Sequence, residues 1–78
     1  MKFYAEEITE MMDGTSAHAL TEKPSENEAL SAVYMALSSA TINPNVRSIH
    51  VEAKNSVGGY YENKTWTNNN VQTAEVAE

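Results

Sequence analysis

Residues 24–44 have the sequence PSENEALSAVYMALSSATINP and predict one amphipathic helix. Ser25 followed three residues later by Glu28 forms a capping box that begins the helix after Pro24. The apolar stripe has the spacing of one helix face and consists of Leu30, Val33, Tyr34, Leu37 and Thr41. Asn43-Pro44 ends the helix, because proline cannot continue it and asparagine tolerates a left-handed cap. We expect about 16 helical residues, or ~24 Å.

The segment after the helix predicts a β-hairpin. Within residues 46–55, the apolar residues Ile49, Val51 and Ala53 alternate with polar ones, the pattern of a strand with one buried face. A turn at residues 57–59, Val-Gly-Gly, precedes a returning strand over 60–67 that is rich in Tyr, Trp and Thr.

The segment before the helix predicts a second hairpin. Residues 2–9 form a strand of high β-propensity, in which a bulge at Glu6-Glu7 would bring Ile8 onto the same face as Phe3. Asp13-Gly14 is the strongest turn signal in the chain. The returning strand over 15–22 is short and weakly apolar, as expected at the edge of a sheet.

Together these elements predict an α+β fold of order ββαββ, with one helix packed on one face of a four-stranded antiparallel sheet. The most apolar strand belongs in the sheet's interior, so we expect the strand order 2-1-3-4. Residues 1–67 would form the single domain and residues 68–78 a flexible tail.

Composition excludes several classes of protein. A chain of 78 residues has room for one small core, and the absence of cysteine excludes disulfides and thiol nucleophiles. The start of the chain has no apolar segment of the signal-peptide type, which predicts a cytoplasmic location without membrane association. No two cationic residues are adjacent, and this disfavours direct binding to nucleic acid.

The net charge of −6 is concentrated in the first third of the chain. Residues 1–28 hold seven of the eleven acidic residues and two of the five basic ones. Such a region can dock on a basic surface of a partner protein, or it can be a solvated face that maintains solubility. Whether it mimics nucleic acid stays open.

No constellation in the sequence predicts catalysis, a metal site or a cofactor. His18 and His50 with Glu52 could form a site of two imidazoles and one carboxylate, but the predicted strand order places another strand between the histidines. Asp13 is expected in a turn, where it cannot orient a catalytic base. Gly58-Gly59 lacks the lysine and helix start of a phosphate-binding loop.

The last strand places Tyr60, Glu62, Lys64 and Trp66 on one face if its alternation is regular. Aromatic residues there can form a protein-binding surface or the part of the core beneath the helix, and both interpretations stay open.

Several short segments resemble small uncharacterised open reading frames of phages and prophages of Gram-positive gut bacteria. They are Asp13–Ala17, Ala19-Leu20, Glu28–Ala32, Ala36–Ala40, Asn45-Val46, Ser48-Ile49, Gly59-Tyr60 and Trp66. The resemblance spans residues 3–66 and supplies no catalytic or binding residues. It implies a family context in which small acidic proteins include inhibitors of host defence, anti-CRISPR proteins among them.

From these observations we expect a non-enzymatic interaction module, an anti-CRISPR-like inhibitor that binds a basic surface of a host defence protein as a monomer or homodimer. The alternatives are a self-associating accessory phage protein, which would use the last hairpin, and a small nucleotide-sequestering protein. The candidate partner-binding residues are Glu6, Glu7, Glu10, Asp13, Glu22, Tyr60 and Trp66.

Overall fold

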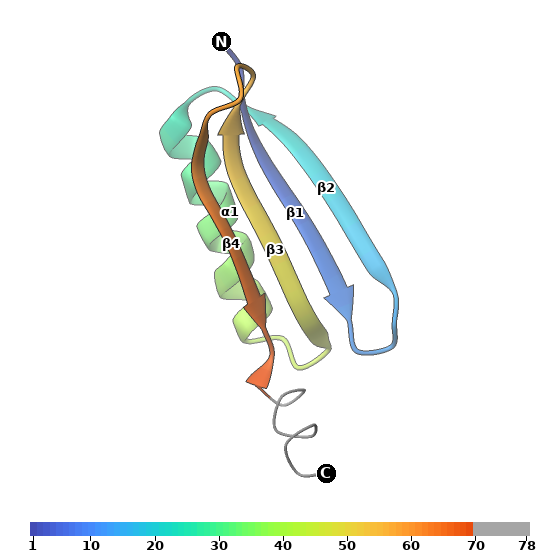
Figure 1. The fold of residues 1–78 in the computed structure, drawn as a ribbon. Coiled ribbons are helices and arrows are strands. Elements are labelled where there is room, and N and C mark those ends of the chain that lie inside the picture. Colours follow the sequence, from blue (N-terminus) through green and yellow to red (C-terminus); the bar gives the residue numbers. More distant parts are fainter. Residues whose placement is uncertain (70–78) are drawn as a thin grey trace.

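The computed structural model describes residues 1–69 and contains one sheet and one helix (Figure 1). The elements in chain order are β1 (Phe3–Met11), β2 (Ser16–Lys23), α1 (Glu26–Thr41), β3 (Val46–Asn55) and β4 (Tyr60–Thr67). All neighbouring strands are antiparallel, in the order β2-β1-β3-β4. The predicted fold class and strand order are therefore confirmed. The helix lies behind the sheet in Figure 1, and no element of residues 1–69 covers the other sheet face, which we call the open face.

Helix α1 begins where the capping box predicts. Ser25 has an extended backbone and its Oγ accepts a hydrogen bond of 3.2 Å from the Glu28 N–H. The end of the helix differs from the prediction, because no residue other than glycine has a positive φ within residues 1–69. Asn43 therefore does not form a left-handed cap. Its N–H donates to the Ala40 carbonyl and its Oδ1 accepts from the Asn45 N–H.

The core lies between α1 and the two central strands. Its buried apolar residues are Ala5, Ala29, Val33, Ala40, Val46, Ile49, Val51 and Ala53. Val33 and Val51 are the largest side chains that are fully buried among the described residues. The predicted helix stripe is rotated in the structure, since Tyr34 is 49% exposed and Leu30 and Leu37 pack at the margin of the core. Small residues face the sheet instead, which lets the helix approach it closely.

Strand β1 pairs without interruption along most of its length. Its register with β2 runs from Phe3 opposite Lys23 to Glu10 opposite Ser16, and its pairing with β3 shifts only between Glu10 and Met11. The bulge at Glu6-Glu7 that would have brought Ile8 onto the Phe3 face is therefore absent. Because the alternation is regular, Glu7 lies on the helix side of the sheet, while Glu6 and Ile8 lie on the open face.

The pairing of β3 with β4 shifts by one residue between Ala53 and Lys54, and this changes which face of the sheet the first residues of β4 occupy. Tyr60 lies opposite Lys54 on the open face and is 57% exposed. Tyr61 and Trp66 pack against the core instead, the Tyr61 ring 6.2 Å from that of Phe3. The prediction that Tyr60 and Trp66 share one face is therefore wrong, and the core interpretation is correct for Trp66 alone.

The chain beyond β4 begins with an ordered residue. Asn68 is buried, and its backbone N–H and its Nδ2 donate to the carbonyls of Arg47 and Val46. Asn69, the next residue of the predicted tail, is exposed, and residues 70–78 lie outside the described part of the chain.

Candidate functional site

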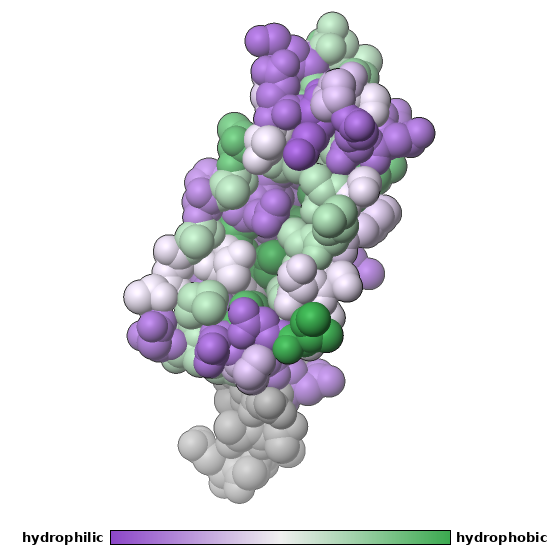
Figure 2. All heavy atoms as spheres, turned by 180° about the vertical axis from the view of Figure 1, so that it is seen from behind, coloured by the Kyte–Doolittle hydropathy of each residue, from purple (hydrophilic) through white to green (hydrophobic). Residues whose placement is uncertain are grey.

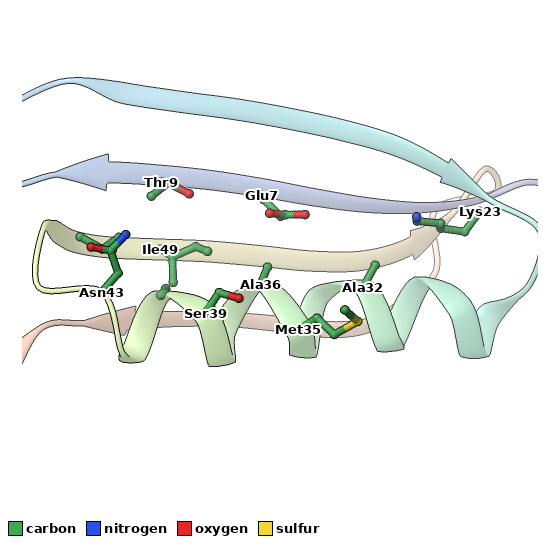
Figure 3. Close-up of a pocket in the computed structure, with 11 residues that line it drawn as sticks. Glu7, Thr9, Lys23, Ala32, Met35, Ala36, Ser39, Asn43 and Ile49 are labelled. Carbon is green, nitrogen blue, oxygen red and sulfur yellow. The ribbon is translucent and has the colours of Figure 1, made fainter.

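A groove runs between α1 and the β1–β2 hairpin, because the helix packs mainly on β3 and β1 and leaves β2 uncovered. It has a volume of ≈ 460 Å³ (Figure 3). Small side chains of α1 form one wall, with Ala32, Ala36 and Ser39 at helical spacing. From the helix side, pale and dark green apolar side chains lie between purple hydrophilic ones (Figure 2).

The groove continues toward the N-terminal end of the helix. A second hollow of ≈ 370 Å³ shares Lys23, Ala32 and Met35 with the first one. Glu22 and Glu28 line this part. Because the two hollows are contiguous, one flank of α1 borders a groove along much of its length.

The short side chains of β2 explain why the groove is open. Ala17 and Ala19 lie opposite Thr9 and Glu7 of β1, so they occupy the helix side of the sheet. Neither alanine belongs to the core cluster or packs against it, and both are exposed. A sheet of four strands with one helix thus leaves a place on β2 where a second element could pack.

Glu7 lies on the floor of this groove (Figure 3). Its direct cross-strand neighbours are Ala19 on β2 and Val51 on β3, both apolar. Glu7 is half-buried, and its carboxylate has no hydrogen bond or ion pair with any group in residues 1–69. Lys23 lines the same groove nearer the start of the helix and does not pair with it. An unpaired carboxylate among apolar side chains is a favourable position for a cation from a partner.

The open face of the sheet carries a polar ladder that crosses all four strands. We define the ladder as His18, Glu6, Lys54, Glu52, His50 and Thr65. Glu6 contacts His18 Nε2 on β2 and Lys54 Nζ on β3, each at 2.5 Å. Glu52 contacts Lys54 Nζ at 3.2 Å and His50 Nε2 at 2.9 Å. His50 Nδ1 lies 2.6 Å from Thr65 Oγ1 on β4.

The ladder changes the ionisation of its central pair. Hydrogen bonds from Lys54 and then from His18 lower the pKa of Glu6 below its usual value. The same contact with Glu6 raises the pKa of Lys54. Both carboxylates of the ladder, Glu6 and Glu52, therefore already have cationic or hydrogen-bonding partners within the ladder.

The ladder does not form a metal site. Ile8 on β1 is the direct cross-strand partner of both His18 and His50, so it separates the two histidines as the strand order predicted. Within residues 1–69, no group of three His, Asp or Glu side chains is arranged to hold a metal ion.

The predicted partner-binding residues are distributed over different parts of the fold. Glu6 and Glu10 lie on the open face, Glu6 within the ladder and Glu10 exposed. Asp13 accepts hydrogen bonds from the Thr15 hydroxyl and N–H, which lower its pKa. The acidic first third of the chain therefore does not form one continuous face.

Two of the predicted acidic residues do border the groove. Glu7 forms part of its floor. Glu22 lines its far end, but its carboxylate lies on the open-face side, 3.8 Å from Lys2 Nζ. Lys23 and Met35 also line the groove, although no motif in the sequence marks either residue. One sequence signal could have indicated the groove. Ala17 and Ala19 alternate along the strand, so the side chains on its helix-facing side are too short to reach a helix.

Comparisons with protein-family models, with curated proteins and with solved structures give no match to this chain. In the described part of the chain, no helix has the length and apolar character needed to cross a membrane.

Proposed function

We propose that this protein is a non-enzymatic interaction module that binds a basic segment of a partner protein in the groove between α1 and β2. The observation that carries the proposal is Glu7, a half-buried residue on the groove floor whose carboxylate pairs with no group in residues 1–69. A lysine or arginine inserted from a partner would pair with this carboxylate away from bulk water, where such contacts are stronger.

The walls of the groove suit a backbone that approaches closely. Ala32, Ala36 and Ser39 present little side-chain bulk, so a partner helix or strand could lie against α1. Met35 is 67% exposed beside them and offers an adaptable apolar contact. The net charge of −6, together with Glu28 at one end of the groove, favours encounter with a basic partner.

We further propose, on the resemblance to phage and prophage reading frames, that the partner is a host defence protein. Inhibition of such a protein requires a stable contact and no chemistry, which agrees with a groove that combines small side chains and one carboxylate. A nucleotide is a poor ligand for the groove, because Glu7 would face its phosphate groups.

The groove is tested by titrating the isotope-labelled protein with a synthetic helical peptide of about 18 residues rich in Ala, Leu and Lys. We expect chemical-shift changes along α1 from Ala32 to Ser39 and at Glu7, and none with a peptide in which glutamate replaces lysine. Glu7→Gln should weaken binding about tenfold, because one charged contact is lost.

Glu10→Gln is the matched control, since Glu10 is an exposed carboxylate of the same strand on the opposite face. If Glu10→Gln weakens peptide binding as much as Glu7→Gln, the groove is not the binding site. An interference assay with host defence nucleases and the same two variants tests the identity of the partner separately.

A further inference from the structure

Strand β2 is an edge strand that lacks the usual protection against pairing. It has eight residues, and the six from Ser16 to Thr21 include no proline and no Asp, Glu, Lys or Arg. Its register with β1 is unbroken, and every residue from Ser16 to Glu22 is exposed. The other edge strand, β4, is interrupted by a register shift and carries Glu62 and Lys64. Long, regular and uncharged edges are templates for another strand.

Alternate residues of β2 direct their backbone N–H and C=O groups to β1 and to the free edge of the sheet, and the β1–β2 turn shows which residues do which. The Met11 N–H donates to the Thr15 carbonyl across the β1–β2 turn, so odd-numbered residues of β2 bond to β1. The even-numbered residues Ser16, His18, Leu20 and Glu22 therefore direct their N–H and C=O groups to the free edge. Their side chains lie on the open face of the sheet.

One antiparallel register makes this edge complementary to itself. With a two-fold axis at Leu20, that residue lies opposite its own copy, and His18 lies opposite Glu22 of the second chain. Outward-facing residues then meet outward-facing residues, which allows about six backbone hydrogen bonds. Leu20, 57% exposed in the single chain, would be covered by an apolar side chain.

The neighbouring registers are less favourable. A shift of two positions places Leu20 opposite either Glu22 or His18, so the apolar pair is lost. A shift of one position mismatches the outward backbone groups. The pattern of Leu20 flanked by an imidazole on one side and a carboxylate on the other thus selects a single alignment.

We infer that two copies of this chain pair through β2 in this register and form a continuous eight-stranded antiparallel sheet. Such an interface is isologous, as in most homodimers. Both helices then lie on one side of the sheet, with the two α1–β2 grooves facing each other. The inference rests on the β2 edge alone and does not depend on what the grooves bind.

Sedimentation of the wild-type chain from 1 to 100 µM is the first test, and a monomer throughout that range overturns the inference. Leu20→Lys should raise the dimer Kd by about two orders of magnitude, because two like charges replace an apolar pair at the axis. Val57→Lys, at an apolar residue 75% exposed in the β3–β4 turn, is the matched control and should leave the Kd unchanged. Both variants should keep the wild-type circular dichroism spectrum.

Cysteine cross-linking tests the register directly, since the chain has no cysteine of its own. In a hydrogen-bonded antiparallel pair the Cα atoms are about 5.5 Å apart, a separation that a disulfide spans. Oxidised Leu20→Cys should become a covalent dimer, while Val57→Cys should remain mostly monomeric. Equal cross-linking rates for the two cysteine variants would show that β2 is not the contact. A dimer that persists in Leu20→Lys but dissociates in Thr65→Pro would place the contact on β4.

Discussion

Lys54 Nζ on β3 lies 2.5 Å from Glu6 Oε1 on β1 and 3.2 Å from Glu52 Oε1 on its own strand. Glu6 and Glu52 are direct cross-strand partners in the two central strands. Like charges in that position repel one another, so the ammonium group of Lys54 makes this pairing compatible with a stable sheet.

Lys54→Met should lower the free energy of unfolding by about 1–2 kcal/mol at neutral pH, because it leaves two half-buried carboxylates facing each other. Urea denaturation monitored by circular dichroism measures the change. Lys64→Met is the control, since Lys64 is exposed and forms no ion pair with residues 1–69. If both variants have the same denaturation midpoint, the ladder does not stabilise the sheet.

The lowered pKa of Glu6 predicts a loss of stability in acid. Hydrogen bonds from Lys54 and then His18 favour the ionised carboxylate in the folded state. The resulting stabilisation is complete above the unfolded value of 4.5 and is lost as the pH falls through the lower folded pKa. Melting temperatures measured from pH 7 to pH 3 should therefore fall less steeply for Glu6→Gln than for the wild type.

Some acid sensitivity should remain in that variant. Thr15 lowers the pKa of Asp13, and Tyr34, which donates a 2.8 Å hydrogen bond, lowers that of Glu62. Both carboxylates act in the same direction as Glu6. An unchanged slope in Glu6→Gln would show that the ladder carboxylate does not contribute.

The order of elements and the bounds of the helix could be predicted from the sequence because their signals are local. Ser25 and Glu28 cap the helix through contacts three residues apart, and Ile49 and Val51 alternate within one strand. The sequence left open whether the strand is bulged at Glu6-Glu7, because the deciding contact is not local. Glu6 is accommodated in a regular strand by Lys54, a residue 48 positions away, which a local pattern cannot reveal.

The candidate site depends on features that are still less local. Glu7 was predicted as a partner-binding residue from charge alone, but its position on a groove floor follows from the placement of α1 over β3 rather than β2. Tyr60 lies on the surface and Tyr61 packs against the core because the pairing of β3 with β4 shifts at Lys54. Such a shift depends on the residues of both strands together, so the sequence of one strand does not predict it.

The centre of the core is at Val33 rather than along the predicted stripe of larger residues. Val33 is 0% exposed, so Val33→Ala should lower the free energy of unfolding by about 2 kcal/mol through lost burial and the cavity left behind. Met35→Ala on the exposed side of the same helix should change it by less than about 0.5 kcal/mol. Chemical denaturation of the two variants compares them, and equal losses would contradict this account of the core.

Asn55 organises the turn between β3 and β4. Its Oδ1 accepts hydrogen bonds from the N–H groups of Val57 and Gly59 at 3.0 and 2.8 Å, and its Nδ2 donates to Tyr61 Oη at 2.9 Å. Asn55→Ala removes all three bonds and should lower the free energy of unfolding by about 2 kcal/mol. Asn55→Asp should cost less, because a carboxylate still accepts from both backbone groups and from the tyrosine hydroxyl.

The contact between Asn55 and Gly59 also predicts a coupling between two substitutions. A Cβ added at Gly59 would lie 2.6 Å from Asn55 Nδ2, so Gly59→Ala should displace the amide and break its hydrogen bonds. In the Asn55→Ala background that clash is absent, and Gly59→Ala should then have almost no effect. A double-mutant cycle measured by urea denaturation should therefore give a coupling free energy of about 1–2 kcal/mol.

Gly58→Ala is the control, because its strain has a different origin. Gly58 has a backbone φ of +92° and open space around the new methyl group, so Gly58→Ala should lower the free energy of unfolding equally with or without Asn55. Additive effects of Gly59→Ala and Asn55→Ala would show that the amide does not hold the turn.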